Sequence, residues 1–212
     1  MAGVAGEAVN RPLPPADLAD PHGMPERVCV PALDVAAWLR EAFVDEGAPL
    51  ENPEHAHLRY AQIGVLWCAV PNARQGNVVA GQAEMPMARG GAWAKARHDQ
   101  QLEEWFGAVP DFVLTFDPVY AAQASDLTFC ALVEHELYHC GQARDAFGAP
   151  RFTRFGTPVF TMRGHDVEEF VGVVARYGAG SAAGKTVALV EAANAPPRFG
   201  DVDVRCVCGT CL

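Results

Sequence analysis

Residues 135–139 read His-Glu-Leu-Tyr-His and lie inside an apolar-periodic stretch that runs from Leu127 to about Ala143. Side chains four positions apart share one side of an α-helix, so a helix here would present both histidines to the same ion. A Ser125-Asp126 pair, typical of a helix N-cap, precedes the stretch. One face of the helix would pack into a core through Phe129, Val133, Leu137 and Cys140. The two histidines lie off that face, where a ligand set rather than a core would need them.

The His-Glu-x-x-His spacing is typical of a zinc site. Two imidazoles one turn apart can bind one Zn²⁺ at about 2.0 to 2.1 Å, and the glutamate beside the first histidine reaches the metal-bound water. His135 and His139 are therefore candidate metal ligands, and Glu136 is a candidate general base. Such a site predicts hydrolysis of peptide bonds through a metal-activated water.

A catalytic zinc needs a third protein ligand and an open position for water. The downstream segment 164–170 reads GHDVEEF and offers several donors. His165 is the first candidate, and a carboxylate of Glu168 or Glu169 is the alternative. Asp166 and the two glutamates are also candidate partners of the ligands, although acidic residues at the start of a helix are explained by the helix dipole alone.

HELYH followed by GHDVEEF resembles the SprT-like (Spartan-type) zinc metallopeptidases, and it is closer still to a family of phage metallopeptidases. The resemblance covers about residues 28–178, with the specific motifs in 128–177. It implies an α+β, zincin-like fold of the minigluzincin type. In that fold a small antiparallel sheet packs on the His-Glu-x-x-His helix and on a second helix that carries a ligand.

The same resemblance implies Zn²⁺ as the cofactor and a protein or peptide as the substrate. It assigns His135, His139 and His165 as zinc ligands and Glu136 as the catalytic base. After His165 the sequence departs from the pattern of the Spartan branch, which has Gly-Pro-Glu-Phe in this segment. The acidity of this chain also does not suit the DNA-bound substrates of the Spartan branch.

The composition of the chain indicates a folded domain and disfavours partners such as nucleic acid and membranes. The chain has 212 residues, of which 50% are hydrophobic and 20% charged, and this mixture is typical of a folded domain. Its formal net charge of −10 disfavours binding to nucleic acid, because phosphates must be neutralised by lysine and arginine. No apolar run reaches the roughly 18 to 20 residues of a membrane span, and no signal peptide is recognisable. We therefore expect no membrane partner and a cytoplasmic location, in the host cytoplasm if a phage encodes the chain.

The predicted organisation has three parts: an irregular Pro-rich leader at 1–27, a metallopeptidase domain at 28–178, and a linker, short helix and Cys-containing tail at 179–212. No internal repeat is apparent, and the oligomeric state is left open. Besides the helix already described, we expect helices at 32–46 (with Asp34 as N-cap), 92–106, 165–177 and 186–194, and strands at 58–70, 77–84 and 112–116.

Seven cysteines in a chain without an export signal favour reduced thiols or metal ligands over disulfides. The tail RCVCGTCL brings together three of them, Cys206, Cys208 and Cys211. These could hold a second metal if Cys29, Cys68 or another chain supplied a fourth ligand. The alternative is an exposed thiol cluster.

Two other functions stay open. The chain could be a non-catalytic, zinc-stabilised protein-interaction module, in which Asp166 or a glutamate closes the metal site. It could also be a peptidase that cleaves one dedicated partner. A second electrophilic group could come from Tyr138, Tyr177 or His98, of which Tyr138 faces away from the histidine pair.

Overall fold

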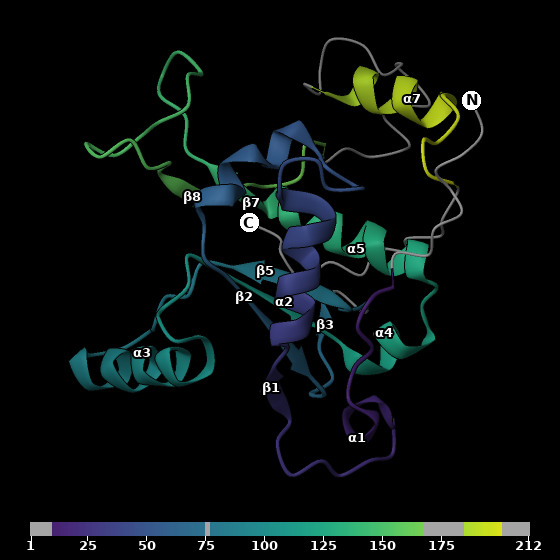
Figure 1. The fold of residues 1–212 in the computed structure, drawn as a ribbon, viewed down its shortest axis with the longest axis vertical. Helices are drawn as coiled ribbons and strands as arrows, with labels where there is room; N and C mark the ends of the chain where they lie inside the picture. Colours follow the sequence, from purple (N-terminus) through teal and green to yellow (C-terminus); the bar gives the residue numbers. More distant parts are fainter. Residues whose placement is uncertain (1–9, 75–76, 168–184, 201–212) are drawn as a thin grey trace.

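The computed structural model describes residues 10–74, 77–167 and 185–200, and it has an α+β fold built on a small mixed sheet (Figure 1). The sheet has the strand order β1-β2-β6-β5. Its strands are β1 (Cys29–Pro31), β2 (Ile63–Cys68), β6 (Phe112–Phe116) and β5 (Gly81–Glu84). The expected α+β class is confirmed.

The expectation of an antiparallel sheet is wrong for the two central strands. β2 and β6 are parallel, with Val65 opposite Leu114, whereas β1 and β5 are antiparallel to their neighbours. Parallel neighbours need a long crossover. Here the crossover contains β3 (Ala73–Arg74), β4 (Asn77–Val78), β5 and the helix α3 (Ala92–Phe106).

Helices cover both faces of the sheet. On one face α2 (Leu33–Leu39) and α5 (Asp126–His139) form the main core, in which Phe129 of α5 packs against Trp38, Trp67 and Phe116. On the other face Leu102 of α3 joins Leu66 and Val113 in a smaller cluster. The two central strands are therefore buried on both sides, which explains their nearly continuous apolar sequences.

Several predicted boundaries are wrong. The expected helix at 32–46 is divided into α2 and the π-helix η1 (Arg40–Val44), and its N-cap is Ala32 rather than Asp34. The reason is that the Ala32 N–H still pairs with the Val65 carbonyl of β2, so the strand runs directly into the helix. The expected strand at 58–70 begins at Ile63, because a 3₁₀-helix, η2 (Pro53–Tyr60), precedes it.

Other elements agree with expectation. α3 and β6 have the predicted bounds, and the short helix α7 (Thr186–Asn194) is present. The expected strand at 77–84 is interrupted between β4 and β5. The helix expected at 165–177 lies outside the described residues beyond Val167.

The helix α5 starts directly after its predicted N-cap, Ser125. It ends earlier than the apolar periodicity of the sequence predicts. The Ser125 side chain accepts a hydrogen bond from the Thr128 N–H. The helix ends at His139 rather than near Ala143, because residues 140–142 form β7 (Cys140–Gln142), which pairs with β8 (Phe160–Met162). This early end moves the last histidine of the motif to a junction between helix and strand.

The segment before β1 packs on the start of α5. It contains the short helix α1 (Ala16–Ala19), whose Leu18 is buried. The buried Arg11 guanidinium donates hydrogen bonds to Asp126 and to the carbonyls of Ala121 and Ala124 at the end of α4 (Pro118–Gln123). The part of the expected leader that the structure describes, residues 10–27, is thus tied to the domain.

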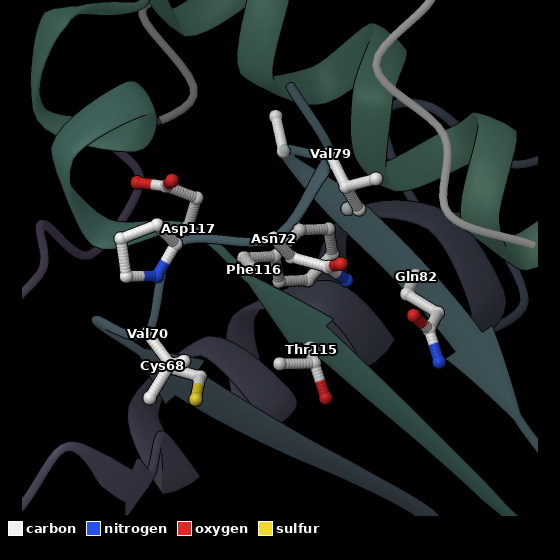
Figure 2. Close-up of a pocket in the computed structure, with 11 residues that line it drawn as sticks. Cys68, Val70, Asn72, Val79, Gln82, Thr115, Phe116 and Asp117 are labelled. Atoms are coloured by element: carbon white, nitrogen blue, oxygen red, sulfur yellow. The ribbon is translucent and has the colours of Figure 1, made fainter. Parts of the chain in front are cut away.

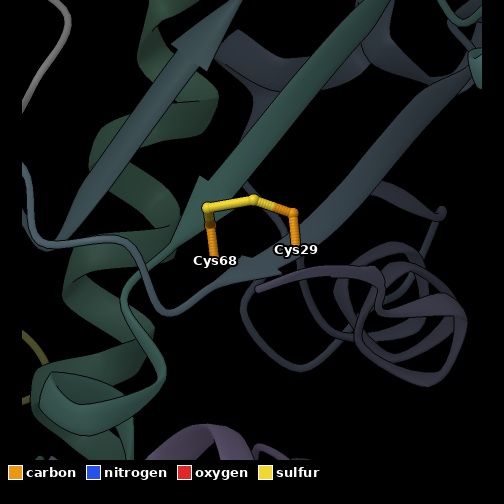
Figure 3. The surroundings of a disulfide bond; sticks show 2 residues. All are labelled: Cys29 and Cys68. Atoms are coloured by element: carbon orange, nitrogen blue, oxygen red, sulfur yellow. A yellow bond between two sulfur atoms is a disulfide. The ribbon is translucent and has the colours of Figure 1, made fainter. Parts of the chain in front are cut away.

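Cys29 and Cys68 form a disulfide between facing residues of β1 and β2 (Figure 3). This overturns the expectation of reduced thiols or metal ligands for this pair, since a disulfide sulfur cannot serve as a thiolate ligand. Cys130 and Cys140 are free and buried. The tail cysteines Cys206, Cys208 and Cys211 lie outside the described residues.

Candidate metal centre

Three histidines that are far apart in the sequence converge on one point. The Nε2 atom of His135 lies 3.3 Å from that of His139 and 3.2 Å from that of His165. Ligands of a tetrahedral Zn²⁺ at about 2.0 to 2.1 Å lie about 3.3 to 3.4 Å from each other. All three donor atoms lie within 4.8 Å of one another, so the group could hold a metal ion.

The helix α5 positions two of these histidines and the glutamate between them. His139 is buried, His135 is half-buried, and Glu136 is fully buried. The apolar residues Phe129, Val133 and Leu137 are fully buried against the core, as the periodicity predicts. Since the apolar face fixes the rotation of the helix, the histidines are left facing a cavity rather than the core.

The hairpin of β7 and β8 brings the third histidine to the site. β7 begins directly after His139, and Cys140 faces Met162 across the pair. The Arg163 N–H then donates a 2.9 Å hydrogen bond to the His139 carbonyl, which extends the pairing by one step. His165, two residues further on, therefore lies beside the end of α5 although it comes 26 positions after His139 in the sequence.

Hydrogen bonding and burial prepare the imidazoles for a metal. His139 donates from Nδ1 to the Arg163 carbonyl at 2.6 Å, which leaves the lone pair of Nε2 directed at the cluster. Burial, together with the neighbouring His139 and His165, lowers the pKa of His135 to about 4. The pKa of His139 is also lowered, chiefly by burial. At neutral pH both imidazoles are therefore in the neutral form that binds metals.

Asp166 lies next to the cluster but is bound elsewhere. Its two carboxylate oxygens each accept a 2.9 Å hydrogen bond from Arg163, and one also accepts a 2.8 Å bond from Lys185. The hydrogen bonds from Lys185 and from Arg163 are the main causes that lower the pKa of Asp166. Asp166 thus holds the residue whose carbonyl orients His139. Glu168 and Glu169 lie outside the described residues.

Glu136 lies against the edge strand β5. A methyl group placed on Gly81 would come within 2.9 Å of Glu136 Oε1 and of Leu132 Cδ1. A residue without a side chain at this point of β5 therefore makes room for the carboxylate. The sequence contains a signal for this role, a glycine at the start of a short strand, but nothing in it indicates which side chain fills the space.

A family model described as "Putative phage metallopeptidase" matches residues 36–194. The chain belongs to this family. The matched region contains all three histidines, Glu136 and the helix α7. Neither a curated protein nor a solved structure matches the chain.

In this member of the phage metallopeptidase family, η2 supports the candidate metal centre in a way that the sequence prediction missed. Asn52 caps η2 and also donates hydrogen bonds to Glu134 and to the Tyr138 hydroxyl. His57 donates from Nε2 to the Cys140 carbonyl at 2.7 Å. Asn-Pro at residues 52–53 is a helix-start signal that would have revealed η2. Its contacts with α5 are tertiary and have no sequence signal.

One cavity lies at the three histidines, and a second cavity adjoins it. One, of about 250 Å³, is lined by the three histidines and by Tyr138, Arg163 and Asp166. The other, of about 850 Å³, lies between η2 and the β7–β8 hairpin and shares Glu54, Tyr138, Arg163 and Lys185 with the first. Tyr138 therefore lines the cavity although the helix period placed it away from the histidine pair. His98 lies on α3, on the opposite face of the sheet, and Tyr177 is outside the described residues.

A third cavity lies at the ends of β2 and β6 and has a different character (Figure 2). Its volume is about 280 Å³, and it shares no lining residue with the histidine cavity. Asp117, the one carboxylate in its lining, accepts a hydrogen bond from the Tyr120 N–H as the N-cap of α4. Within the part of the chain that the structure describes, the group of side chains that could hold a metal ion is therefore the histidine cluster.

Within the described residues, no helix is both long enough and apolar enough to cross a membrane.

Proposed function

We propose that this chain is a zinc-dependent metallopeptidase of the SprT-like, zincin type, in which His135, His139 and His165 bind the metal. The observation that carries the proposal is the convergence of the three Nε2 atoms at separations of 3.2 and 3.3 Å. Three neutral imidazoles suit Zn²⁺, and a three-histidine set keeps a coordination position for water. Membership of the phage metallopeptidase family supports the same activity.

Glu136 is the general base of the proposed reaction. When bound, the zinc lowers the pKa of a water molecule and polarises the carbonyl of the scissile peptide. Glu136 takes a proton from the attacking water and later passes it to the leaving amine. Its place directly after His135 on α5 and the burial of its side chain against Gly81 support this role, because a carboxylate excluded from bulk solvent keeps a fixed position. His139 is oriented by the Arg163 carbonyl, and Arg163 by Asp166.

The edge strand β5 is a suitable place for a substrate backbone. It is the outermost strand of the sheet on the side of β6, and its Gly81 packs on Glu136. An extended peptide can add to such an edge through main-chain hydrogen bonds. This arrangement would bring a peptide bond close to the proposed base.

The non-catalytic module receives less support. A closed metal site needs a fourth protein ligand, and Asp166, the described candidate, is held by Arg163 and Lys185. A peptidase that cleaves a single dedicated partner remains compatible with the proposed chemistry, and it would differ in the range of substrates cleaved.

Metal content and hydrolysis measured on the same three variants test the proposal. We expect one zinc per chain in the wild type and in Glu136→Gln, and loss of zinc in His165→Ala. Glu136→Gln should lose at least about 100-fold in peptide hydrolysis. His98→Ala, on the opposite face of the sheet, is the matched control and should keep both zinc and activity. Wild-type hydrolysis by Glu136→Gln would refute its role, and retention of zinc by His165→Ala would refute the ligand set.

A further inference from the structure

The segment between β7 and β8 contains a short tandem repeat, so the expectation that the chain has no internal repeat is wrong here. Residues 145–150 read DAFGAP and residues 153–158 read TRFGTP. Phenylalanine, glycine and proline recur at the same three positions, eight residues apart. The two copies are too short to have been recognised from overall periodicity.

The two copies fold into the same turn. Gly148 and Gly156 have φ angles of 84° and 81°, which favour glycine, and each N–H bonds to the carbonyl three residues earlier. The side chain of the first turn residue also accepts hydrogen bonds in each copy. Asp145 accepts them from the Phe147 and Ala149 N–H groups, and Thr153 accepts one from the Phe155 N–H. Both turns are therefore preorganised by their own sequences.

Three backbone hydrogen bonds close the base of the two turns. Ala143 donates to Val159, Arg151 donates to Ala143, and Val159 donates to Arg151, at 2.8, 2.8 and 3.0 Å. We call residues 143–159 the double-turn arm. In Figure 1 the arm extends away from the sheet beside β8. It is thus an ordered projection rather than a simple loop.

The arm exposes aromatic side chains at the tips of its turns. Phe147 is 96% exposed and Phe155 is 79% exposed, and Phe152 between them is also exposed. The Arg154 guanidinium lies 4.6 Å from the centre of the Phe155 ring. Exposed aromatic and arginine side chains on a rigid support are the residues that dominate binding interfaces. The tips of the arm therefore have the composition of a contact surface.

The charge of the arm is opposite to that of the whole chain. The arm has three arginines, at 144, 151 and 154, and one aspartate, whose carboxylate is used inside the first turn. The chain as a whole has a net charge of −10. An acidic partner would be attracted to the arm and repelled from most of the remaining surface.

The arm also adjoins the larger of the two cavities near the histidines. Arg144 and Pro150 line the cavity of about 850 Å³, which shares Tyr138 and Arg163 with the histidine cavity. A chain segment held by the arm could continue through this cavity to the candidate metal centre.

We propose that the double-turn arm is a docking surface for an unfolded segment of the substrate protein that is rich in acidic and large apolar residues. The identification of the partner as a substrate rests on the proposed peptidase function. Phe147 and Phe155 contact the apolar side chains, and Arg144, Arg151 and Arg154 face the carboxylates. A protein segment is favoured over a nucleic acid, because three arginines are few against a continuous row of phosphates and the rest of the chain repels them.

Binding measured without hydrolysis tests this proposal. The probes are a fluorescent 20-residue peptide of Glu, Leu, Phe and Ser, the same peptide with Lys in place of Glu, and a 20-nucleotide oligothymidylate. In the Glu136→Gln background we expect the acidic peptide to bind at least tenfold more tightly than the other two. Phe147→Ser/Phe155→Ser and Arg151→Glu/Arg154→Glu should each weaken that binding at least tenfold.

Matched controls come from α3 and the segment before it. Trp93 is 84% exposed, and Arg89 and Arg97 are exposed as well. Trp93→Ser and Arg89→Glu/Arg97→Glu should leave binding unchanged. The proposal is overturned if the acidic peptide does not bind, if the arm variants bind it like the wild type, or if the lysine peptide or the oligonucleotide binds as tightly.

A second measurement separates the arm from the chemistry. In the Glu136-containing enzyme, the arm variants should raise KM for the long acidic peptide at least tenfold and keep kcat for a blocked tetrapeptide. Absence of hydrolysis in the wild type would refute the peptidase function but leave the binding result standing. An equal loss on both substrates, with zinc retained, would refute a docking role.

Discussion

The Arg163 carbonyl accepts a 2.6 Å hydrogen bond from His139 Nδ1, while the Arg163 N–H donates to the His139 carbonyl. One residue thus holds both the main chain and the side chain of a proposed metal ligand. Its guanidinium is bound in turn by Asp166, so a carboxylate outside the proposed ligand set is linked to a ligand through Arg163.

Asp166→Asn should weaken zinc binding about tenfold, because loss of the charge loosens Arg163 and with it His139. Competition with a chromogenic chelator measures this affinity. Asp99→Asn, which removes the partner of Lys95 on α3, is the control and should not change it. Equal affinity for Asp166→Asn and wild type would show that Arg163 is held well enough by its backbone.

Gly81→Ala should reduce kcat about tenfold or more at unchanged zinc content, because the new methyl group would displace the Glu136 carboxylate. Crowding in a packed region also lowers the free energy of unfolding by about 1 to 3 kcal/mol. Steady-state kinetics with metal analysis separates these effects. Gly91→Ala meets no atom within 4 Å and should leave kcat unaltered. Normal turnover by Gly81→Ala would mean that the carboxylate has room to move.

The Cys29–Cys68 disulfide closes a loop with a sequence separation of 39 residues. Its removal should lower the free energy of unfolding by about 4 kcal/mol through the entropy of the unfolded chain. Denaturant unfolding with and without a reductant measures the loss. Cys29→Ser/Cys68→Ser should have the same free energy of unfolding as the reduced wild type, and reductant should not change it. If reductant still lowered the stability of this variant, other cysteines would be responsible for the loss.

His55 should make the stability pH-dependent in mild acid. Burial, followed by the charges of His57 and Arg163, lowers its pKa from 6.5 to about 4. Above pH 6.5 the imidazole is neutral in both states; as the pH falls toward 4 the unfolded state takes up the proton first, so stability decreases. The full effect is on the order of 3 kcal/mol. His55→Phe should reduce the fall of the unfolding free energy between pH 6.5 and 4 without abolishing it, because the lowered pKa values of His135 and His139 also contribute. The exposed His22→Phe is the control and should leave the fall unchanged.

Local signals in the sequence predicted the elements that depend on few distant contacts. Ser125 caps α5 as expected, and Gly107, with φ at 80°, ends α3 at the predicted residue. The apolar face of α5 also predicted which side would be buried. The histidine motif could therefore be placed on its helix before any tertiary contact was known.

The remaining differences come from long-range pairing. The parallel arrangement of β2 and β6 depends on a crossover whose direction no local pattern encodes. The early end of α5 depends on the pairing of β7 with β8, residues that lie about 20 positions apart. The closeness of His165 to the helix depends on the same hairpin, so its distance from His139 in sequence says little about their distance in space.

Because hydrogen bonds close its base, the double-turn arm can change in evolution without a change in the candidate metal centre. The backbone hydrogen bonds among Ala143, Arg151 and Val159 hold the two ends of the arm together next to β8. The residues of the two turns therefore do not determine where Arg163 and His165 lie. The tips could be lengthened, shortened or exchanged between relatives while the three imidazoles keep their geometry. Selection for a new target could therefore act on the arm independently of selection for the chemistry, and an engineer could replace the arm in the same way.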